Sequence, residues 1–127
     1  LTGWTQFPSG TASVSDNFKK FGTQSFLLNA SGDKIYQDVT IPASGTGTYT
    51  LSAYVKVDGE GTASLSVDGQ TAEIANVLDS AASTSSESEN QRLCLTFDVT
   101  AAGEVRVNLN KTGTANVYFD GVQLEMS

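Results

Sequence analysis

Histidine is absent from this sequence of 127 residues, and cysteine and tryptophan each occur only once. The chain therefore lacks the commonest general base, any histidine-dependent catalytic triad and a histidine-based zinc site. It also contains no phosphate-binding P-loop and no dinucleotide-binding glycine motif. A glycosidase needs only two carboxylates, but most of the fourteen acidic residues lie in predicted turns or in a serine-rich stretch. We therefore expect no enzymatic activity.

Positive charge is scarce, with seven basic residues against fourteen acidic ones and a formal net charge of -7. A nucleic-acid-binding protein needs a basic field to displace counterions, so we expect no nucleic-acid partner. Anionic membrane surfaces are disfavoured for the same reason. Insertion into a membrane is not expected either, because no apolar run approaches the roughly 18–20 residues of a membrane span. A neutral glycan, or a cation such as calcium, is compatible with this charge.

The single cysteine, Cys94, cannot form a disulfide within the chain. It lies between Leu93 and Leu95, which favours a half-buried strand residue over a reactive thiol. An extracellular protein without disulfides is more typical of bacteria than of animals. The sequence starts at Leu1 with neither Met nor a signal peptide. We therefore expect a piece of a larger secreted or cell-surface protein, appended to other domains.

The commonest polar residues favour β-structure. Only 17% of the residues are charged, and Ser, Thr, Asn, Gln and Gly supply most of the polarity. Ser, Thr and Gly compete with helix formation or weaken it, so this composition favours strands and turns. Residues 51–57 alternate strictly between apolar and other side chains, which is the pattern of a strand with one buried face. The expected inward residues of this strand are Leu51, Ala53, Val55 and Val57, with Tyr49 on the same face.

The same alternation recurs along the chain and predicts one all-β domain over residues 1–127. Residues 58–61 are typical of a hairpin turn, and residues 79–90 predict a mobile serine-rich loop. Residues 72–78 allow a weaker helical alternative. About seven or eight short strands joined by turns indicate an antiparallel β-sandwich or jelly roll. The other predicted strands lie at Ser25–Leu28 and within residues 35–41, 63–67, 93–99, 105–109 and 117–124.

Four segments carry a resemblance to a known family. Together they resemble the jelly-roll carbohydrate-binding modules of families 4, 9 and 22 and the galactose-binding-like superfamily. Similar segments occur in bacterial cell-surface proteins with YD repeats and in phage tail proteins. The resemblance implies a non-catalytic module that attaches a larger protein to a polysaccharide or other glycan. The segments are Gly3-Trp4-Thr5, Phe21-Gly22-Thr23-Gln24-Ser25-Phe26, Tyr49-Thr50-Leu51-Ser52-Ala53-Tyr54-Val55-Lys56 and Val117-Tyr118-Phe119-Asp120-Gly121-Val122-Gln123-Leu124-Glu125.

The resemblance is incomplete in two places, and the second of them, together with the long predicted loop at residues 79–90, favours a different function. Such domains usually begin one strand earlier, and that strand is missing before Leu1. The strand near Arg92 usually opens with a tryptophan, and Asn90-Gln91-Arg92 stands in its place. The alternative is a structural or adhesive spacer, or a protein-interaction domain of a surface or phage tail protein, without sugar binding.

The resemblance also implies a structural calcium ion between the loop at residues 21–25 and Asp120. Asp120 shares parity with Tyr118, Val122 and Leu124, so its side chain is predicted to point inward. A buried carboxylate needs either a cation or hydrogen-bond donors. If the cation is present, Gln24 and Ser25 are expected to contribute further oxygens.

The outward positions of the strands predict the ligand-binding face. In the resembling modules, the concave outer face of a sheet binds oligosaccharide. An aromatic ring packs on a sugar ring, while arginine and amide side chains bind its hydroxyls. Trp4 either serves as such a platform or fills one end of the sandwich, and we favour the structural role. The predicted ligand-binding residues are Tyr54, Lys56, Arg92, Arg106 and Asn108, with Tyr36 and Gln37 as weaker candidates.

Overall fold

Strands make up nearly all of the computed structural model, which describes residues 5–7, 12–15, 25–29, 34–79 and 88–126. One short 3-10 turn, η1, spans Ala43–Gly45. Within the described ranges no helix has the length and hydropathy needed to cross a membrane. The prediction of an all-β chain is confirmed. The ten strands are β1 (Thr5–Phe7), β2 (Ala12–Ser15), β3 (Ser25–Leu28), β4 (Lys34–Ile41), β5 (Gly47–Asp58), β6 (Gly61–Gly69), β7 (Glu73–Asp79), β8 (Ser88–Ala101), β9 (Gly103–Gly113) and β10 (Asn116–Met126).

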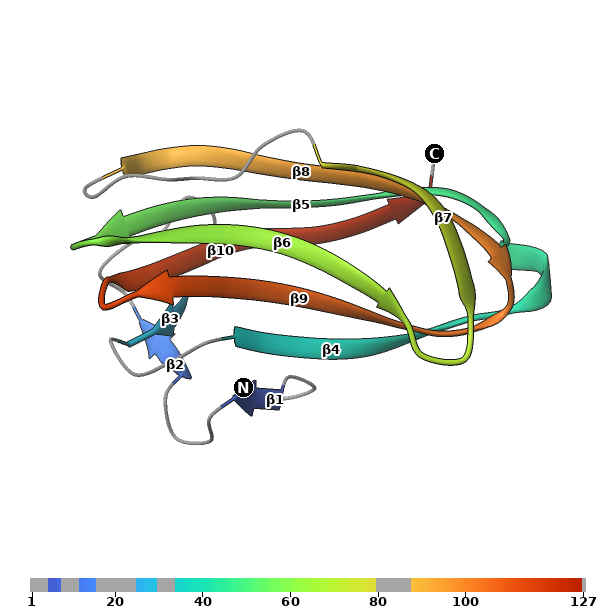
Figure 1. Ribbon diagram of the computed structural model, residues 1–127, viewed down its shortest axis with the longest axis horizontal. Coiled ribbons are helices and arrows are strands. Elements are labelled where there is room, and N and C mark those ends of the chain that lie inside the picture. The colour runs from blue at the N-terminus through green and yellow to red at the C-terminus, as the bar shows by residue number, and fades with distance from the viewer. Residues whose placement is uncertain (1–4, 8–11, 16–24, 30–33, 80–87, 127) are drawn as a thin grey trace.

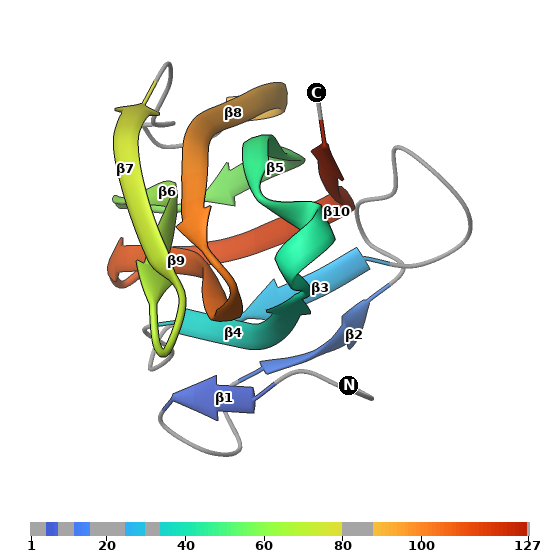
Figure 2. The same ribbon diagram turned by 90° about the vertical axis from the view of Figure 1, so that its right-hand side faces the viewer.

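The strands form two antiparallel sheets that face each other (Figure 1). One sheet has the order β1-β4-β9-β6, and the other has the order β2-β3-β10-β5-β8-β7. Figure 2 shows the six-stranded sheet curving from β7 over β8 and β5 to β10, with β9 and β4 on the opposite side. Among the described strands, only β2–β3 and β7–β8 are neighbours both in sequence and in a sheet. The other connections cross between the sheets, as in a jelly roll, so the predicted fold class is confirmed.

Three local predictions need correction. Residues 58–61 do turn the chain, but they do not close a hairpin, because β5 and β6 belong to different sheets. Their turn is held instead by the backbone N–H groups of Thr114 and Ala115, which donate to the carbonyl of Glu60 at 3.0 and 2.9 Å. The helical alternative at residues 72–78 is wrong, since β7 occupies most of that stretch. The predicted loop at residues 79–90 is shorter than expected, because Ser88 already begins β8, and residues 80–87 lie outside the described ranges.

The apolar side chains of the alternating positions fill the space between the sheets. Phe97 and Phe119 are among the largest fully buried side chains. The Tyr49 ring stacks on Phe97 with 6.0 Å between centroids, and its hydroxyl donates to the carbonyl of Gly45 at 2.6 Å. Cys94 is half-buried, as predicted. The inward residues predicted for the strands within residues 49–57, 63–67, 93–99 and 105–109 are all buried, namely Tyr49, Leu51, Ala53, Val55, Val57, Ala63, Leu65, Val67, Leu93, Leu95, Phe97, Val99, Val105, Val107 and Leu109.

Two leucines on neighbouring strands test this assignment of the core. Leu95 of β8 is 2% exposed, whereas Leu78 of β7 is 66% exposed. Replacing Leu95 with Ala should reduce the free energy of unfolding by about 2–5 kcal/mol, because it leaves a cavity in the interior. The same change at Leu78 should cost less than about 0.5 kcal/mol. Urea denaturation of both variants measures the difference, and equal losses would contradict the described core.

Candidate functional site

The predicted ligand-binding residues lie on two different outer faces. Tyr54 and Lys56 of β5 and Arg92 of β8 lie on the outer face of the six-stranded sheet. Arg106 and Asn108 of β9 lie on the four-stranded sheet, on the other side of the sandwich. The expectation of a single shared face is therefore wrong. Alternation shows whether a side chain points inward or outward, but it does not show which sheet a strand joins.

Tyr36 and Gln37 are also separated, because neighbouring residues of a strand point to opposite faces. Tyr36 pairs with Asn108 and faces outward on β4. Gln37 pairs with the buried Val107, so its side chain lies on the inner side of the sheet, with Ile35. Gln37 is thus not part of the face that carries Tyr36 and does not belong to the candidate site.

Nine outward side chains of β4, β9 and β6 form three rows across the four-stranded sheet. We call this set the polar grid. All members except Asn108 are partly or fully exposed. The rows, given in the order β4, β9, β6, are Lys34–Asn110–Ser64, Tyr36–Asn108–Ser66 and Asp38–Arg106–Asp68.

A three-residue cluster occupies one side of the grid. The Nε and Nη2 atoms of Arg106 donate to the two carboxylate oxygens of Asp38 at 2.8 and 3.1 Å. The Arg106 guanidinium carbon also lies 4.0 Å from the centroid of the Tyr36 ring, close enough for a cation–π contact. The hydrogen bond from Arg106 lowers the pKa of Asp38 below its ordinary value. Asp38 thus holds Arg106 over the tyrosine.

Asn108 is the central member of the grid and is only 1% exposed. Its Nδ2 donates to Oδ2 of Asp68 at 3.0 Å, which fixes the amide orientation, because a flip would set two acceptors against each other. Its Oδ1 is buried and has no hydrogen-bond partner. An unpaired buried acceptor costs about 1–3 kcal/mol. The middle row therefore contains an unsatisfied acceptor that is covered by its neighbours.

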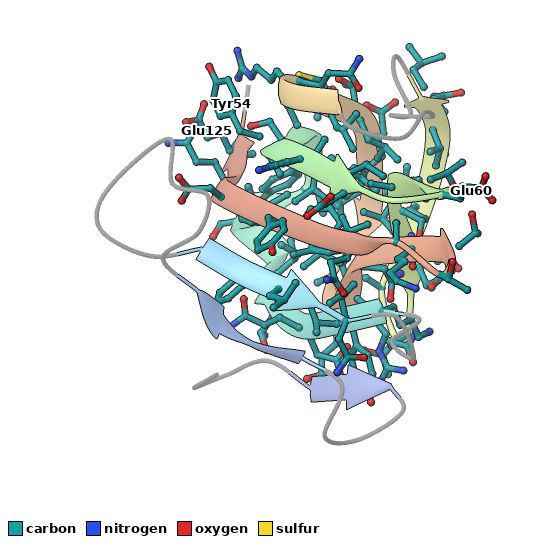
Figure 3. All side chains as sticks on the ribbon, turned by 90° about the vertical axis from the view of Figure 1, so that its left-hand side faces the viewer. Tyr54, Glu60 and Glu125 are labelled. Carbon is teal, nitrogen blue, oxygen red and sulfur yellow. The ribbon has the colours of Figure 1, made fainter. Side chains whose placement is uncertain are left out.

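The outer face of the six-stranded sheet also carries polar and aromatic side chains. Tyr54 lies between Arg92 and Asp120 in register, and the Arg92 guanidinium carbon is 6.0 Å from its ring centroid. Figure 3 shows Tyr54 pointing outward, on the same side as Glu125 and away from the side chains between the sheets. Lys56 lies 5.8 Å from the ring centroid of its cross-strand neighbour Tyr118. Three outward side chains of this face are nevertheless buried, namely Ser52, Tyr118 and Asp120.

Asp120 is buried as expected, at 7% exposure, but the predicted inward direction is wrong. It pairs with the outward Tyr54, because a register shift between Asp120 and Gln123 reverses the parity along β10. Gly121 sits in this bulge with a φ of 60°, and its backbone N–H donates to Oδ1 of Asp120 at 2.8 Å. The alternation expected from the sequence does not continue regularly through residue 124, because the bulge lies between Asp120 and Gln123.

The described part of the predicted metal site brings two residues near each other. Phe26 of β3 pairs with Phe119 of β10, so Ser25 and Asp120 are the next residues along these adjacent strands. Gln24 lies outside the described residues, as does Trp4. Among the described residues, no group of three or more acidic, histidine or cysteine side chains could hold a metal ion.

The fold is shared with several solved structures, although no family model matches the sequence and no curated protein sequence matches it. A Clostridium thermocellum xylanase 10B fragment, a family 22 carbohydrate-binding module joined to a family 10 catalytic module and complexed with xylohexaose, is 20% identical. The match has a TM-score of 0.71 and covers 98% of this chain but only 26% of the xylanase fragment.

Two further structures have the same fold. The family 61 module TmCBM61, complexed with β-1,4-galactotriose, is 11% identical, with a TM-score of 0.68 over 99% of this chain and 90% of the module. Tailspike protein 4 of bacteriophage CBA120 is 14% identical, with a TM-score of 0.66 over 99% of this chain and 20% of the tailspike chain. The predicted likeness in fold to carbohydrate-binding modules is therefore confirmed.

A second carboxylate with a lowered pKa braces the other sheet. Asp98 of β8 accepts hydrogen bonds from Nδ2 of Asn76 at 2.8 Å and from Oγ1 of Thr48 at 2.7 Å. The bond from Asn76, followed by the bond from Thr48, lowers the pKa of Asp98 below its ordinary value. Asp98 therefore links three neighbouring strands, β7, β8 and β5, on the outer face.

Asp38 and Asp98 should make the stability of the fold depend on acidity. A carboxyl group whose pKa is lower in the folded state stabilises the fold above the ordinary value of 3.8, and the contribution disappears as the pH falls through the lowered value. The melting temperature of the wild type should therefore fall more between about pH 6 and pH 2.5 than that of an Asp38→Asn/Asp98→Asn double variant. An equal fall in melting temperature for the wild type and the double variant over this pH range would contradict the role of these two groups.

Proposed function

We propose that this domain is a non-catalytic carbohydrate-binding module that binds a polysaccharide or other glycan through the polar grid. In this proposal it attaches a larger secreted or cell-surface protein, of bacterial or phage origin, to the glycan. One observation carries the proposal: eight of the nine grid side chains are partly or fully exposed, and they combine one aromatic residue, Tyr36, with charged, amide and hydroxyl groups on one sheet face. On the outer face of the other sheet three residues are buried, Ser52, Tyr118 and Asp120, whereas Asn108 is the one buried member of the grid.

The chemistry of the grid suits a sugar. The part of the half-exposed Tyr36 ring that the Arg106 guanidinium does not cover supplies aromatic surface against which the apolar side of a pyranose ring can pack. The Asn110 amide and the exposed Asp68 carboxylate can exchange hydrogen bonds with hydroxyl groups. Two solved structures with this fold hold oligosaccharides, which supports the proposal without naming the glycan of this chain.

We also propose a structural calcium ion beside Asp120. Oδ1 of the buried Asp120 accepts a hydrogen bond from the backbone of Gly121, and we expect further ligand oxygens from Ser25 on the adjacent strand and from Gln24. Calcium binds six to eight oxygen ligands and commonly combines carboxylates with carbonyl oxygens. The ion would brace β3 against β10 and would take no part in glycan binding by the opposite sheet.

Affinity electrophoresis and calorimetry test the glycan-binding proposal. The wild type should bind xylohexaose, β-1,4-galactotriose or another member of a broad glycan panel, and Tyr36→Ala should weaken that binding by at least about tenfold, or ~1.4 kcal/mol. Tyr54→Ala is the matched control, because it removes the same side chain from the opposite face, and should leave the affinity unchanged. Absence of binding across the panel would favour the spacer, for which the missing tryptophan near Arg92 already argues.

Calcium binding should appear as thermal stabilisation. Adding calcium after treatment with a chelator should raise the melting temperature of the wild type, because the ion binds only the folded state. Asp120→Asn should abolish this increase. Asp58→Asn provides the control, since Asp58 is exposed at the end of β5 and should leave the calcium response intact. An equal calcium response in wild type and Asp120→Asn would contradict the site.

A further inference from the structure

We infer that Arg106 determines which glycans the polar grid accepts, because Asp38 holds its guanidinium over Tyr36 and leaves a face that takes neutral sugars and excludes acidic ones. This inference rests on the proposed function and adds the class of ligand. It depends on three features of the grid: the engagement of Arg106, the balance of charge around it, and the unpaired acceptor of Asn108.

The guanidinium of Arg106 is already engaged. Two of its nitrogens donate to the two oxygens of one carboxylate, that of Asp38, in the geometry that a sugar carboxylate would otherwise take. The side chains of Arg106 and Asp38 are 27% and 30% exposed, so the pair stands at the surface where a ligand would arrive. A uronic acid would therefore have to displace Asp38 before it could use this arginine.

The charges around the pair also oppose an anion. Asp68 lies directly across from Arg106 on β6, so the arginine is flanked by a carboxylate on each side within its row. Lys34, in the row with Asn110 and Ser64, is the other cation of the grid. Its Nζ lies 5.5 Å from the centroid of the Tyr36 ring. The grid thus carries two positive and two negative groups on a chain with a net charge of -7. A polyanion gains little from such a surface.

The hydrogen-bonding capacity of the grid also favours a neutral ligand over an acidic one. Oδ1 of Asn108 is an acceptor without a partner, and the carboxylates of Asp38 and Asp68 are acceptors too. Sugar hydroxyls can donate to the two exposed carboxylates, and to Oδ1 of Asn108 once the side chains that cover it move, whereas an ionised carboxylate can only accept. A neutral, hydroxyl-rich glycan therefore matches the grid, and a uronate does not.

Asp38→Asn tests this inference because it removes one negative charge and loosens the hold on Arg106. Binding of the wild type, Asp38→Asn and Asp38→Asn/Arg106→Gln to a neutral β-1,4-xylan and to polygalacturonate is compared at low and high salt. The wild type should bind the xylan, or another neutral glycan of the panel, at least about tenfold more tightly than polygalacturonate. Asp38→Asn should gain affinity for polygalacturonate in low salt, and the double variant should lose that gain.

Asp58→Asn is the matched control, because it removes the same charge from an exposed position outside the grid. An equal gain in polygalacturonate binding by this variant would overturn the role of Arg106 in favour of a general charge effect. A wild type that binds neutral and acidic polymers equally would overturn the selectivity but leave the glycan-binding function standing. A wild type that binds no glycan at all would overturn both.

Discussion

The packing of β9 against the interior is the constraint on which the candidate site depends. Val105, Val107 and Leu109 point inward and are at most 2% exposed, so this strand cannot rotate or slip without exposing them. The residues between them, Arg106 and Asn108, are consequently held on the outer face. Because β9 lies between β4 and β6, its register with both strands aligns their outward side chains into rows. The alternation of side chains along β9 therefore places core residues on its inner face and grid residues on its outer face.

The grid combines a well-ordered arrangement with an unsatisfied group. Asp38, Arg106 and Tyr36 hold one another in place, and Asn110 donates from Nδ2 to Oγ of Ser66 at 3.0 Å. Preorganised side chains lose little conformational entropy when a ligand binds. In the middle of this arrangement the carbonyl oxygen of Asn108 remains buried and unpaired. Most buried polar groups in native proteins have partners, so an exception at the centre of an accessible polar surface is a reason to look for a ligand there.

Much of the fold, and less of the site, could be predicted from the sequence. Alternation identified the inward residues of β5, β6, β8 and β9, because burial of one face imposes a period of two. It could not assign strands to sheets, so Tyr54 and Arg106 were placed on one surface although they lie on opposite sides of the sandwich. The predicted direction of Asp120 is wrong because the bulge at Gly121 reverses the parity of the strand. The glycine of the Asp-Gly pair inside the predicted strand is the sequence feature that could have indicated a bulge. The burial of Asn108 depends on its neighbours across two other strands, which local patterns do not contain.

The most direct test of the account is a nuclear magnetic resonance titration of the isotope-labelled domain with a glycan it binds. The account predicts that the largest chemical-shift changes occur along β4 and β9, including the side-chain amides of Asn108 and Asn110. The signals of Tyr54 and Arg92, on the far sheet, should stay in place. Changes concentrated around Tyr54 and Arg92, with β4 and β9 unaffected, would contradict the assignment of the polar grid as the ligand-binding face.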